Sequence, residues 1–208
     1  MKDDWRGFVL DGSSKSIRKL MRSYFYWKHH LIALDEFITK DNINNLLGQS
    51  GFEEDLGILS IDLDGNDYFI LEAINKFKPR ILICEYNPIF GEMRKITIPY
   101  QPDFYRTNSH YSNLYWGASL AAMTHLADNK GYSLVGTNSA GNNAFYVRKN
   151  LINKKVNILS VEEAYSSSNY RESRDENGNL SYITAEERLN VIKGLPVFNV
   201  ETQSIEVI

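Results

Sequence analysis

Short apolar runs recur in the first part of the chain. They cover residues 7–11 (GFVLD), 31–34 (LIAL), 57–62 (GILSID) and 80–86 (RILICEY). Continuous rather than alternating apolarity is typical of strands that are buried on both faces, as in a parallel sheet covered by helices. We therefore expect these runs to be strands of one parallel sheet.

Longer amphipathic stretches separate the apolar runs. Residues 14–27, 39–48 and 67–77 have the length and spacing of helices, and Thr39 or Asp41 is a suitable N-cap for the second of them. Strands and helices thus alternate along the chain. Because parallel strands are joined by right-handed crossovers, this order predicts an open, doubly wound α/β sheet.

The residue pattern changes after the fourth apolar run. Residues 91–116 are polar and aromatic with little periodicity, which predicts a long lid or binding loop or, alternatively, a disordered segment. A helix over residues 118–129 follows. Two strands at 132–135 and 144–148, around a turn rich in Gly and Asn, then predict a hairpin that ends the sheet.

The composition turns polar from about residue 153, with a turn expected at 176–179 and a short helix at 185–193. We therefore divide the chain into an α/β domain over residues 1–150 and a C-terminal extension over residues 151–208.

Composition and charge narrow the class of protein. The 208 residues are 43% hydrophobic and 24% charged, which is typical of an ordinary globular domain. Twenty-three Lys and Arg against 26 Asp and Glu give a net charge of -3, so we expect no nucleic-acid partner. The single cysteine excludes an internal disulfide framework, and no apolar run approaches the roughly 20 residues that cross a bilayer. We expect a cytoplasmic protein without a membrane span, and a homo-oligomer is compatible with the sequence.

Ligands of a doubly wound sheet gather outside the carboxyl ends of its strands, so the residues there are candidates for a site. An acid at a strand end can accept both hydroxyls of a ribose, and small residues after it allow close approach. Asp11 fits this description, but an acid that only caps the following helix fits it equally well. The strand-end candidates are Asp11, Gly12 and Ser13, then Phe37 and Ile38, then Asp62 and Asp64, and finally Glu85 and Asn87.

The run DLDGND at residues 62–67 can be compared with two known motifs. An EF-hand calcium loop would need Gly and Glu where the chain has Asp67 and Ala73, which excludes it. A phosphatase of the haloacid dehalogenase type also begins with an apolar strand followed by Asp-x-Asp-Gly. Asp62 would then be the nucleophile, although Asn66 stands where Thr or Val is usual.

A third possibility joins two strand ends. Asp62, Glu85 and Asn87 form an oxygen-only set that is suited to magnesium, manganese or calcium. The same carboxylates could instead cap helices and accept hydrogen bonds from loop amides. The sequence leaves both interpretations open.

Motifs in a fixed order extend over nearly the whole chain. They are WRGFVLDG (5–12), DNIN (41–44), LSIDLDGNDY (59–68), PR (79–80), CEYN (84–87), GASL (117–120), KGY (130–132) and RESRD (171–175). In this order they resemble a bacterial family of S-adenosylmethionine-dependent methyltransferase-like proteins near the FkbM-type enzymes, which are often associated with surface-glycan biosynthesis.

The resemblance implies a Rossmann-like class I methyltransferase fold, a doubly wound sheet with a C-terminal β-hairpin. It also implies roles for the strand-end residues. Asp11, followed by Gly12 and Ser13, matches the acid that holds the cofactor ribose, while Phe37 and Ile38 lie near the adenine.

For the reacting end of the cofactor, the resemblance implies that Asp62 ends the strand beside the transferred methyl group. Asp62, Glu85 and Asn87 also look like the ligands of metal-dependent O-methyltransferases. In those enzymes a cation such as Mg²⁺ or Mn²⁺ binds and acidifies the substrate hydroxyl.

One departure from the family concerns its first strand. Class I methyltransferases begin with a strand and a glycine-rich turn that takes up the methionine part of the cofactor, and this unit normally precedes the strand at residues 7–11. In the family's order the missing strand lies between those at 7–11 and 57–62, so we expect two unpaired edges inside the sheet. We favour a fragment from an internal start codon over a strand from a partner or a different closure of the sheet. We accordingly expect weak or absent cofactor binding.

The polar and aromatic segment supplies the remaining candidates. His110 is suited to act as a general base. Tyr115 and Trp116 precede a helix at the mouth of the expected site and are suited to stacking on a sugar or aromatic substrate, although aromatic residues that only anchor a loop are as common.

The sequence thus predicts a methyltransferase that moves a methyl group from S-adenosylmethionine to an oxygen of a glycan precursor or other small molecule. Asp62, Glu85 and His110 are its expected catalytic residues. Two alternatives stay open, a non-catalytic scaffold or oligomer subunit with the same fold and, third, the phosphatase.

Overall fold

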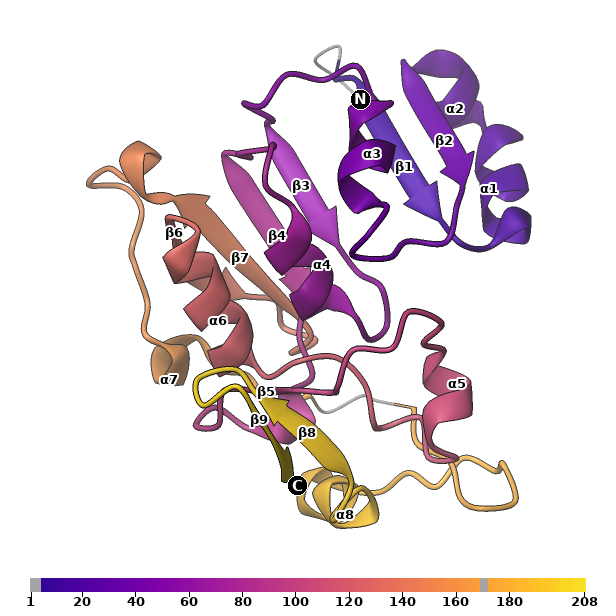
Figure 1. Ribbon diagram of the computed structural model, residues 1–208, viewed down its shortest axis with the longest axis vertical. Helices are drawn as coiled ribbons and strands as arrows, with labels where there is room; N and C mark the ends of the chain where they lie inside the picture. Colours follow the sequence, from indigo (N-terminus) through magenta and orange to yellow (C-terminus); the bar gives the residue numbers. More distant parts are fainter. Residues whose placement is uncertain (1–4, 169–171) are drawn as a thin grey trace.

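The computed structural model describes residues 5–168 and 172–208 and is a mixed α/β structure (Figure 1). Its described strands form three sheets. In chain order the strands are β1 (Gly7–Asp11), β2 (Leu31–Asp35), β3 (Ile58–Ile61), β4 (Ile81–Glu85), β5 (Ile96–Thr97), β6 (Tyr132–Thr137), β7 (Asn143–Arg148), β8 (Pro196–Asn199) and β9 (Ser204–Val207).

The four apolar runs are all strands, but they do not form one sheet. β1 and β2 pair in parallel, with Gly7 opposite Leu31 and Asp11 opposite Asp35. A separate four-stranded sheet has the order β3-β4-β7-β6, in which β3 and β4 are parallel. The predicted hairpin is confirmed, since β6 and β7 pair antiparallel and β7 also pairs with β4.

The division between the two sheets falls where the sequence predicts unpaired edges. Among the described residues, β1 pairs only with β2, and β3 pairs only with β4. The expectation of one continuous sheet is therefore corrected, because no described strand joins β1 to β3. The arrows of β1, β2 and β3 point the same way in Figure 1, so their carboxyl ends face the same side of the molecule.

The helices largely follow the amphipathic stretches, but the helix expected over residues 67–77 ends at Ala73, because the backbone of Ile74 is extended. The helix expected over residues 14–27 is divided, because Ser23 begins a new helix and its hydroxyl accepts a hydrogen bond from the backbone N–H of Tyr26 (3.4 Å). The helices are α1 (Ser14–Met21), α2 (Tyr24–Lys28), α3 (Ile43–Gly48), α4 (Asp67–Ala73), α5 (Arg106–Ser109), α6 (Leu120–Asn129), α7 (Val161–Ala164) and α8 (Ala185–Val191), with short 3-10 turns η1 (Pro88–Phe90) and η2 (Lys149–Leu151).

The largest hydrophobic cluster lies between the four-stranded sheet and the helices α4 and α6, which cover the same face of it in Figure 1. Leu82 and Cys84 of β4 are fully buried there, as are Met123 of α6 and Tyr146 of β7. Burial in this core accounts for Leu82 and Cys84, but Ile81 is 37% exposed and Ile83 is only partly buried, so the expectation that the fourth run is buried on both faces is corrected.

A second cluster joins segments that the sequence assigned to a loop and to an extension. Ile96 and Trp116, from the polar and aromatic segment, pack with Ile192 and Val197 near the C-terminus, and all four side chains are buried. β5, β8 and β9 form an antiparallel sheet beside this cluster. The C-terminal residues therefore contribute to the hydrophobic core.

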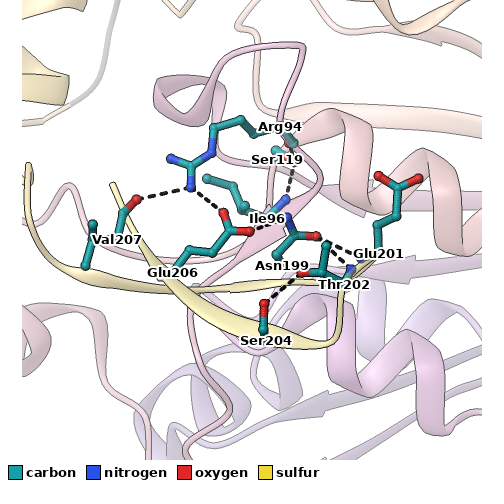
Figure 2. A network of polar contacts seen from close by, with 9 residues as sticks. All are labelled: Arg94, Ile96, Ser119, Asn199, Glu201, Thr202, Ser204, Glu206 and Val207. Carbon is teal, nitrogen blue, oxygen red and sulfur yellow. Dashed lines mark hydrogen bonds and ion pairs between the residues drawn. The ribbon is translucent and has the colours of Figure 1, made fainter.

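Polar contacts fasten the β8–β9 hairpin to the segment before α6 (Figure 2). The Ser119 hydroxyl donates a hydrogen bond to the carbonyl oxygen of Arg94 (2.6 Å) and accepts one from the N–H of Ile96 (3.3 Å). The Arg94 guanidinium pairs with Glu206 of β9 (2.8 Å), whose other carboxylate oxygen accepts a hydrogen bond from the Asn199 amide (2.6 Å). This network and the second cluster hold the C-terminal hairpin in place.

Candidate functional site

A cavity of about 860 Å³ lies at the carboxyl ends of β1, β2 and β3. Its walls come from the ends of these strands, from the segment around α5 and from residues near the C-terminal turn. The lining residues are Leu10, Asp11, Gly12, Ser13, Phe37, Ile38, Asp62, Leu63, Asp64, Asn66, Phe104, Tyr105, Arg106, Thr107, Tyr111, Asn113, Glu172 and Arg174.

All of the residues predicted to bind the cofactor line this cavity. They come from the ends of three strands that lie in two different sheets. The structure therefore brings together side chains that lie as many as 51 positions apart in the sequence (62 − 11 = 51). The residues are Asp11, Gly12, Ser13, Phe37, Ile38 and Asp62.

The end of β1 combines a capped helix with a close approach. One carboxylate oxygen of Asp11 accepts a hydrogen bond from the N–H of Ser13 (2.7 Å), and the Ser13 hydroxyl accepts one from the N–H of Ser16 to cap α1 (3.2 Å). A Cβ atom on Gly12 would lie 3.0 Å from the Phe37 ring, so glycine lets the two strand ends approach. Ser13, rather than Asp11, is therefore the N-cap of α1, while Asp11 holds the turn before the helix and lines the cavity.

Two aromatic rings form one wall. The Phe37 ring, after β2, and the Tyr105 ring, just before α5, have centroids 5.5 Å apart with an angle of 38° between their planes. Both side chains line the cavity and are more than a third exposed. Such a pair offers apolar faces to a flat ring in the cavity.

A tight turn after β3 forms another part of the wall. Asp64 has a positive φ of 55°, and a Cβ atom on the next residue, Gly65, would lie 2.2 Å from the Phe104 ring. The Asp67 carboxylate accepts hydrogen bonds from the N–H groups of Leu63 (2.9 Å) and Gly65 (3.1 Å). Asp67 therefore fixes the turn that positions Asp62 and Asp64.

Asp67 is fully buried at the start of α4, and burial raises its pKa to about 7. The negative charge of Asp62 also raises this pKa, while the backbone hydrogen bonds oppose the shift. The turn is thus held by a carboxyl group that changes its protonation state near neutral pH.

Asn66 links the turn to the segment that leads to α5. Its side-chain N–H₂ donates a hydrogen bond to the carbonyl oxygen of Gln101 (2.7 Å). Its side-chain oxygen is buried and makes no hydrogen bond among the described residues, although Asn66 lines the cavity. An unpaired buried carbonyl oxygen is costly, which makes it a ready acceptor for a ligand N–H or O–H.

Arg106 connects the segment around α5 to the turn after β3. Its guanidinium pairs with Asp64 (3.2 Å), donates to the carbonyl oxygen of Asn113 (2.8 Å) and lies over the Trp116 ring, 4.9 Å from the centroid. The side chain is 16% exposed. Arg106 therefore joins the segment around α5 to the turn after β3, which the four-stranded sheet supplies.

The C-terminal RESRD motif also reaches the cavity. Glu172 and Arg174 line it and form an ion pair, in which the Arg174 Nε donates to the carboxylate at 2.7 Å. The backbone N–H of Arg174 donates to the carbonyl oxygen of Ser112 (3.2 Å). Arg171, the first residue of the motif, lies outside the described residues.

The structure does not gather the predicted metal ligands at the cavity. Asp62 lines it, but Glu85 and Asn87 are buried and do not. The Asn87 amide donates to the carbonyl oxygens of Leu114 (3.0 Å) and Trp116 (2.9 Å), and its own oxygen accepts from the backbone. Asn87 thus organises the loop before α6, and no group of three or more His, Cys, Asp or Glu residues in the described part of the chain is placed to hold a metal ion.

The predicted base lies beside the cavity wall. His110 does not line the cavity, although the next residue, Tyr111, does, and their rings are 4.4 Å apart. The His110 Nδ1 is 2.7 Å from the Ser112 hydroxyl oxygen. Partial burial lowers the pKa of His110, which favours its neutral form.

The predicted substrate-stacking residues are packed in the second cluster. Trp116 is fully buried under Arg106, and Tyr115 is 6% exposed and donates a hydrogen bond to the carbonyl oxygen of Pro196. Neither ring lines the cavity. In this structure both rings anchor the segment before α6, which is the other role that their position suggested.

The sequence did not single out three residues that shape the cavity, namely Tyr105, Asn66 and Arg106. Tyr105 and Arg106 lie within the segment 91–116 that was predicted to bind a ligand. The local sequence does not show which side chain of that segment contacts the turn after β3. Asn66 lies within the DLDGND motif, where it was considered only as a departure from a phosphatase pattern.

Comparison of the chain with protein-family models, curated proteins and solved structures gives no significant match. No helix within the described ranges is both long and apolar enough to span a membrane.

Proposed function

We propose that the cavity binds the adenosine part of S-adenosylmethionine and that the chain is an S-adenosylmethionine-dependent methyltransferase acting on an oxygen of a glycan precursor or other small molecule. The observation that carries this proposal is the convergence of Asp11, Phe37 and Asp62 on one cavity from three strand ends. This is the position at which sheets of this kind place their ligands.

The volume and the lining residues of the cavity are suited to an adenosine group. Its volume of about 860 Å³ lies within the range of small-molecule sites. The Asp11 carboxylate keeps acceptor capacity for ribose hydroxyls, because its hydrogen bond to Ser13 uses only part of it. The rings of Phe37 and Tyr105 can pack against an adenine, and the buried oxygen of Asn66 can accept a hydrogen bond.

The charge of the cavity fits a cationic ligand. Its lining holds four carboxylates, from Asp11, Asp62, Asp64 and Glu172, and two guanidinium groups, from Arg106 and Arg174. Asp64 and Glu172 form ion pairs with those two arginines, and Asp11 forms no ion pair with another described residue. The carboxylate of Asp11 favours a positively charged ligand over a phosphate ester, which argues against the phosphatase.

When bound, the cofactor supplies an activated methyl group. The residues of this chain would hold the ribose and adenine and stabilise the adjacent positive charge through Asp62. His110, whose pKa is lowered by burial, is the proposed base for the acceptor hydroxyl, and this role requires its ring to turn toward the cavity from its place beside Tyr111.

Calorimetry with the whole chain tests the binding step. We expect S-adenosylmethionine to bind weakly, with a Kd of about 0.1 to 1 mM, because one carboxylate and two rings make the main contacts. Asp11→Asn should weaken S-adenosylmethionine, S-adenosylhomocysteine and adenosine alike, by about tenfold. Asp62→Asn should weaken only S-adenosylmethionine, because only this ligand carries the sulfonium charge.

Asp103→Asn is the matched control, since Asp103 is exposed and does not line the cavity. Absence of binding by all three ligands would contradict the proposal and favour the non-catalytic scaffold. Equal losses in the Asp103 and Asp11 variants would also contradict it. Hydrolysis of para-nitrophenyl phosphate that is lost in Asp62→Asn would establish the phosphatase instead.

A further inference from the structure

Positive charge is concentrated in one part of a chain that is acidic overall. Residues 13–34 contain no Asp or Glu, but they contain five Lys and Arg residues and the pair His29-His30, whereas the whole chain has a net charge of -3. These residues form α1, α2 and all of β2 except its last residue, Asp35, at the edge of the molecule beyond β1 (Figure 1).

The cations of α1 share one face of the helix. Lys15, Arg18, Lys19 and Arg22 follow the spacing i, i+3, i+4 and i+7, which places them along one stripe. All four are exposed, and none of them forms an ion pair with a described residue. Ile17, on the opposite side of the helix, is buried at 4% exposure. The stripe therefore faces solvent.

The aromatic side chains of α2 are exposed next to this stripe. Tyr24, Phe25 and Trp27 are 68%, 62% and 80% exposed, and no residue of α2 is buried. The Lys28 ammonium lies over the Tyr24 ring, 5.1 Å from its centroid. α1 and α2 contact each other at the same edge of the molecule, and we call their exposed cations and aromatic rings the α1–α2 surface.

We propose that the α1–α2 surface binds the surface of a membrane that contains anionic lipids. Its four aligned cations complement anionic headgroups, and each Lys or Arg close to such a membrane contributes roughly fivefold to the partition coefficient. Trp and Tyr prefer the headgroup region, and Phe reaches the boundary with the acyl chains. The cations thus match the anionic headgroups, and the aromatic side chains match the boundary between the headgroups and the acyl chains of the same membrane.

A lipid surface explains the aromatic residues better than a nucleic acid does. A nucleic-acid duplex, whose bases are stacked on one another, would account for the cations alone, and the acidic remainder of the chain would oppose a long polyanion. A flat membrane instead meets only the edge at which α1 and α2 lie, while the cavity lining is formed by other residues. The proposal is independent of the proposed methyl transfer.

Vesicle flotation with the full chain tests the proposal. We expect the protein to float with vesicles of equal parts phosphatidylcholine and phosphatidylglycerol and to remain unbound with phosphatidylcholine alone. Replacing Lys15, Arg18, Lys19 and Arg22 by Gln should lower the partition coefficient at least about a hundredfold. The matched control replaces four exposed lysines elsewhere, Lys78, Lys154, Lys155 and Lys193, by Gln and should change it less than about threefold, because distant charges are screened.

The aromatic part of the surface needs a separate readout. Phe25→Ser with Trp27→Ser should weaken vesicle binding about tenfold, whereas Leu180→Ser with Tyr182→Ser, which also removes exposed apolar side chains, should not. Tryptophan fluorescence of the wild type should shift to shorter wavelength on adding anionic vesicles. This shift should be absent in Trp27→Phe, which retains Trp5 and Trp116.

Three results would overturn the proposal: no flotation with anionic vesicles, equal flotation with phosphatidylcholine alone, or equal losses in the α1 and control variants. Circular dichroism of each variant verifies that it is folded. Binding of duplex DNA or RNA in fluorescence anisotropy, lost in the α1 variant and without any vesicle binding, would assign the surface to a nucleic acid and thus also overturn it.

Discussion

Two small sheets adjoin the four-stranded sheet, and they are held to it very differently (Figure 1). Every residue of β1 is only partly buried, and Ala33 is the buried residue of β2. In the β5–β8–β9 sheet, by contrast, Ile96, Thr97 and Val197 are at most 1% exposed. The two sheets are similar in size but differ in how much apolar surface they bury.

The polar contacts follow the same division. The network in Figure 2 ties the C-terminal hairpin to Arg94 and Ser119, and Lys95 forms an ion pair with Glu201 (2.7 Å). On the other side, the region after β2 is linked through the backbone N–H of Lys40, which donates to the Tyr100 hydroxyl oxygen (3.2 Å), and through Asn44 near α4.

The cavity lies against the more weakly held sheet. Binding elements are commonly drawn from the less stable parts of a protein, because they must move to admit a ligand. A ligand that contacts Asp11 and Phe37 on one side and Asp62 on the other would connect the two sheets. The difference between the two small sheets therefore predicts where ligand binding changes the dynamics.

A matched pair of isoleucine substitutions gives the largest expected contrast. Ile96→Ala in β5 removes a side chain that is 1% exposed and should lower the free energy of unfolding by about 3 kcal/mol. Ile32→Ala in β2, where the side chain is 41% exposed, should lower it by less than about 1 kcal/mol. Urea denaturation measures both. Equal losses would show that the two sheets are held equally well.

The turn after β3 should respond to pH through Asp67. Its folded pKa of about 7 lies above the ordinary value of 3.8, so the folded state binds the extra proton. The stabilisation is fully present below pH 3.8 and is lost as the pH rises through 7. Between pH 5 and pH 8, the wild type should lose about 2 to 3 kcal/mol relative to Asp67→Asn.

Urea denaturation of both proteins at the two pH values checks this prediction, with Asp103→Asn as the control. A wild-type-to-variant difference that stays constant with pH would contradict the assignment of a raised pKa to Asp67. The result also bears on the comparison of the sheets. It measures how much Asp67 contributes to the stability of the turn by which the four-stranded sheet borders the cavity.

Arg106→Gln should make the segment around α5, residues 104–113, more mobile. The substitution removes the ion pair with Asp64 and the contact with the Trp116 ring, at a cost of about 1 kcal/mol in the free energy of unfolding. Hydrogen exchange of residues 104–113 should become faster, while that of β8 and β9 should not change. Lys154→Gln, an exposed substitution, is the control, and an equal effect there would remove Arg106 from this role.

The smallest expected effect concerns the ion pair in Figure 2. Arg94 and Glu206 are 41% and 34% exposed, so a double-mutant cycle with Arg94→Gln and Glu206→Gln should give a coupling of about 0.5 kcal/mol. Thermal or urea denaturation of the four proteins measures it. A coupling of about 3 kcal/mol would mean that the network, rather than burial of Val197, holds the hairpin.

Much of the fold was predictable because apolar runs mark strands. The four strands from β1 to β4 lie within one residue of their predicted ends, and the hairpin of β6 and β7 is confirmed. The sequence predicted unpaired edges at the strands that became β1 and β3, but it did not predict that these strands lie in two separate sheets. The break at Ser23 was missed, because a serine within an amphipathic stretch is compatible with a continuous helix until its hydroxyl caps a new one.

The candidate site was predictable where it follows from strand ends. Asp11, Phe37 and Asp62 line one cavity because parallel strands bring their carboxyl ends to one side. Tertiary packing decided the rest. Trp116 is a core residue, and the Arg106 guanidinium lies over its ring. These contacts join segments that are distant in the sequence, so no local sequence pattern predicts them.

Hydrogen exchange with and without saturating S-adenosylmethionine tests most directly whether the cavity between the two sheets is the cofactor site. The account predicts slower exchange at residues 10–13, 36–39 and 62–66, which border the cavity from both sheets, and no change in β8 and β9. Unchanged exchange at all three cavity segments, or slowing confined to segments away from the cavity, would contradict it.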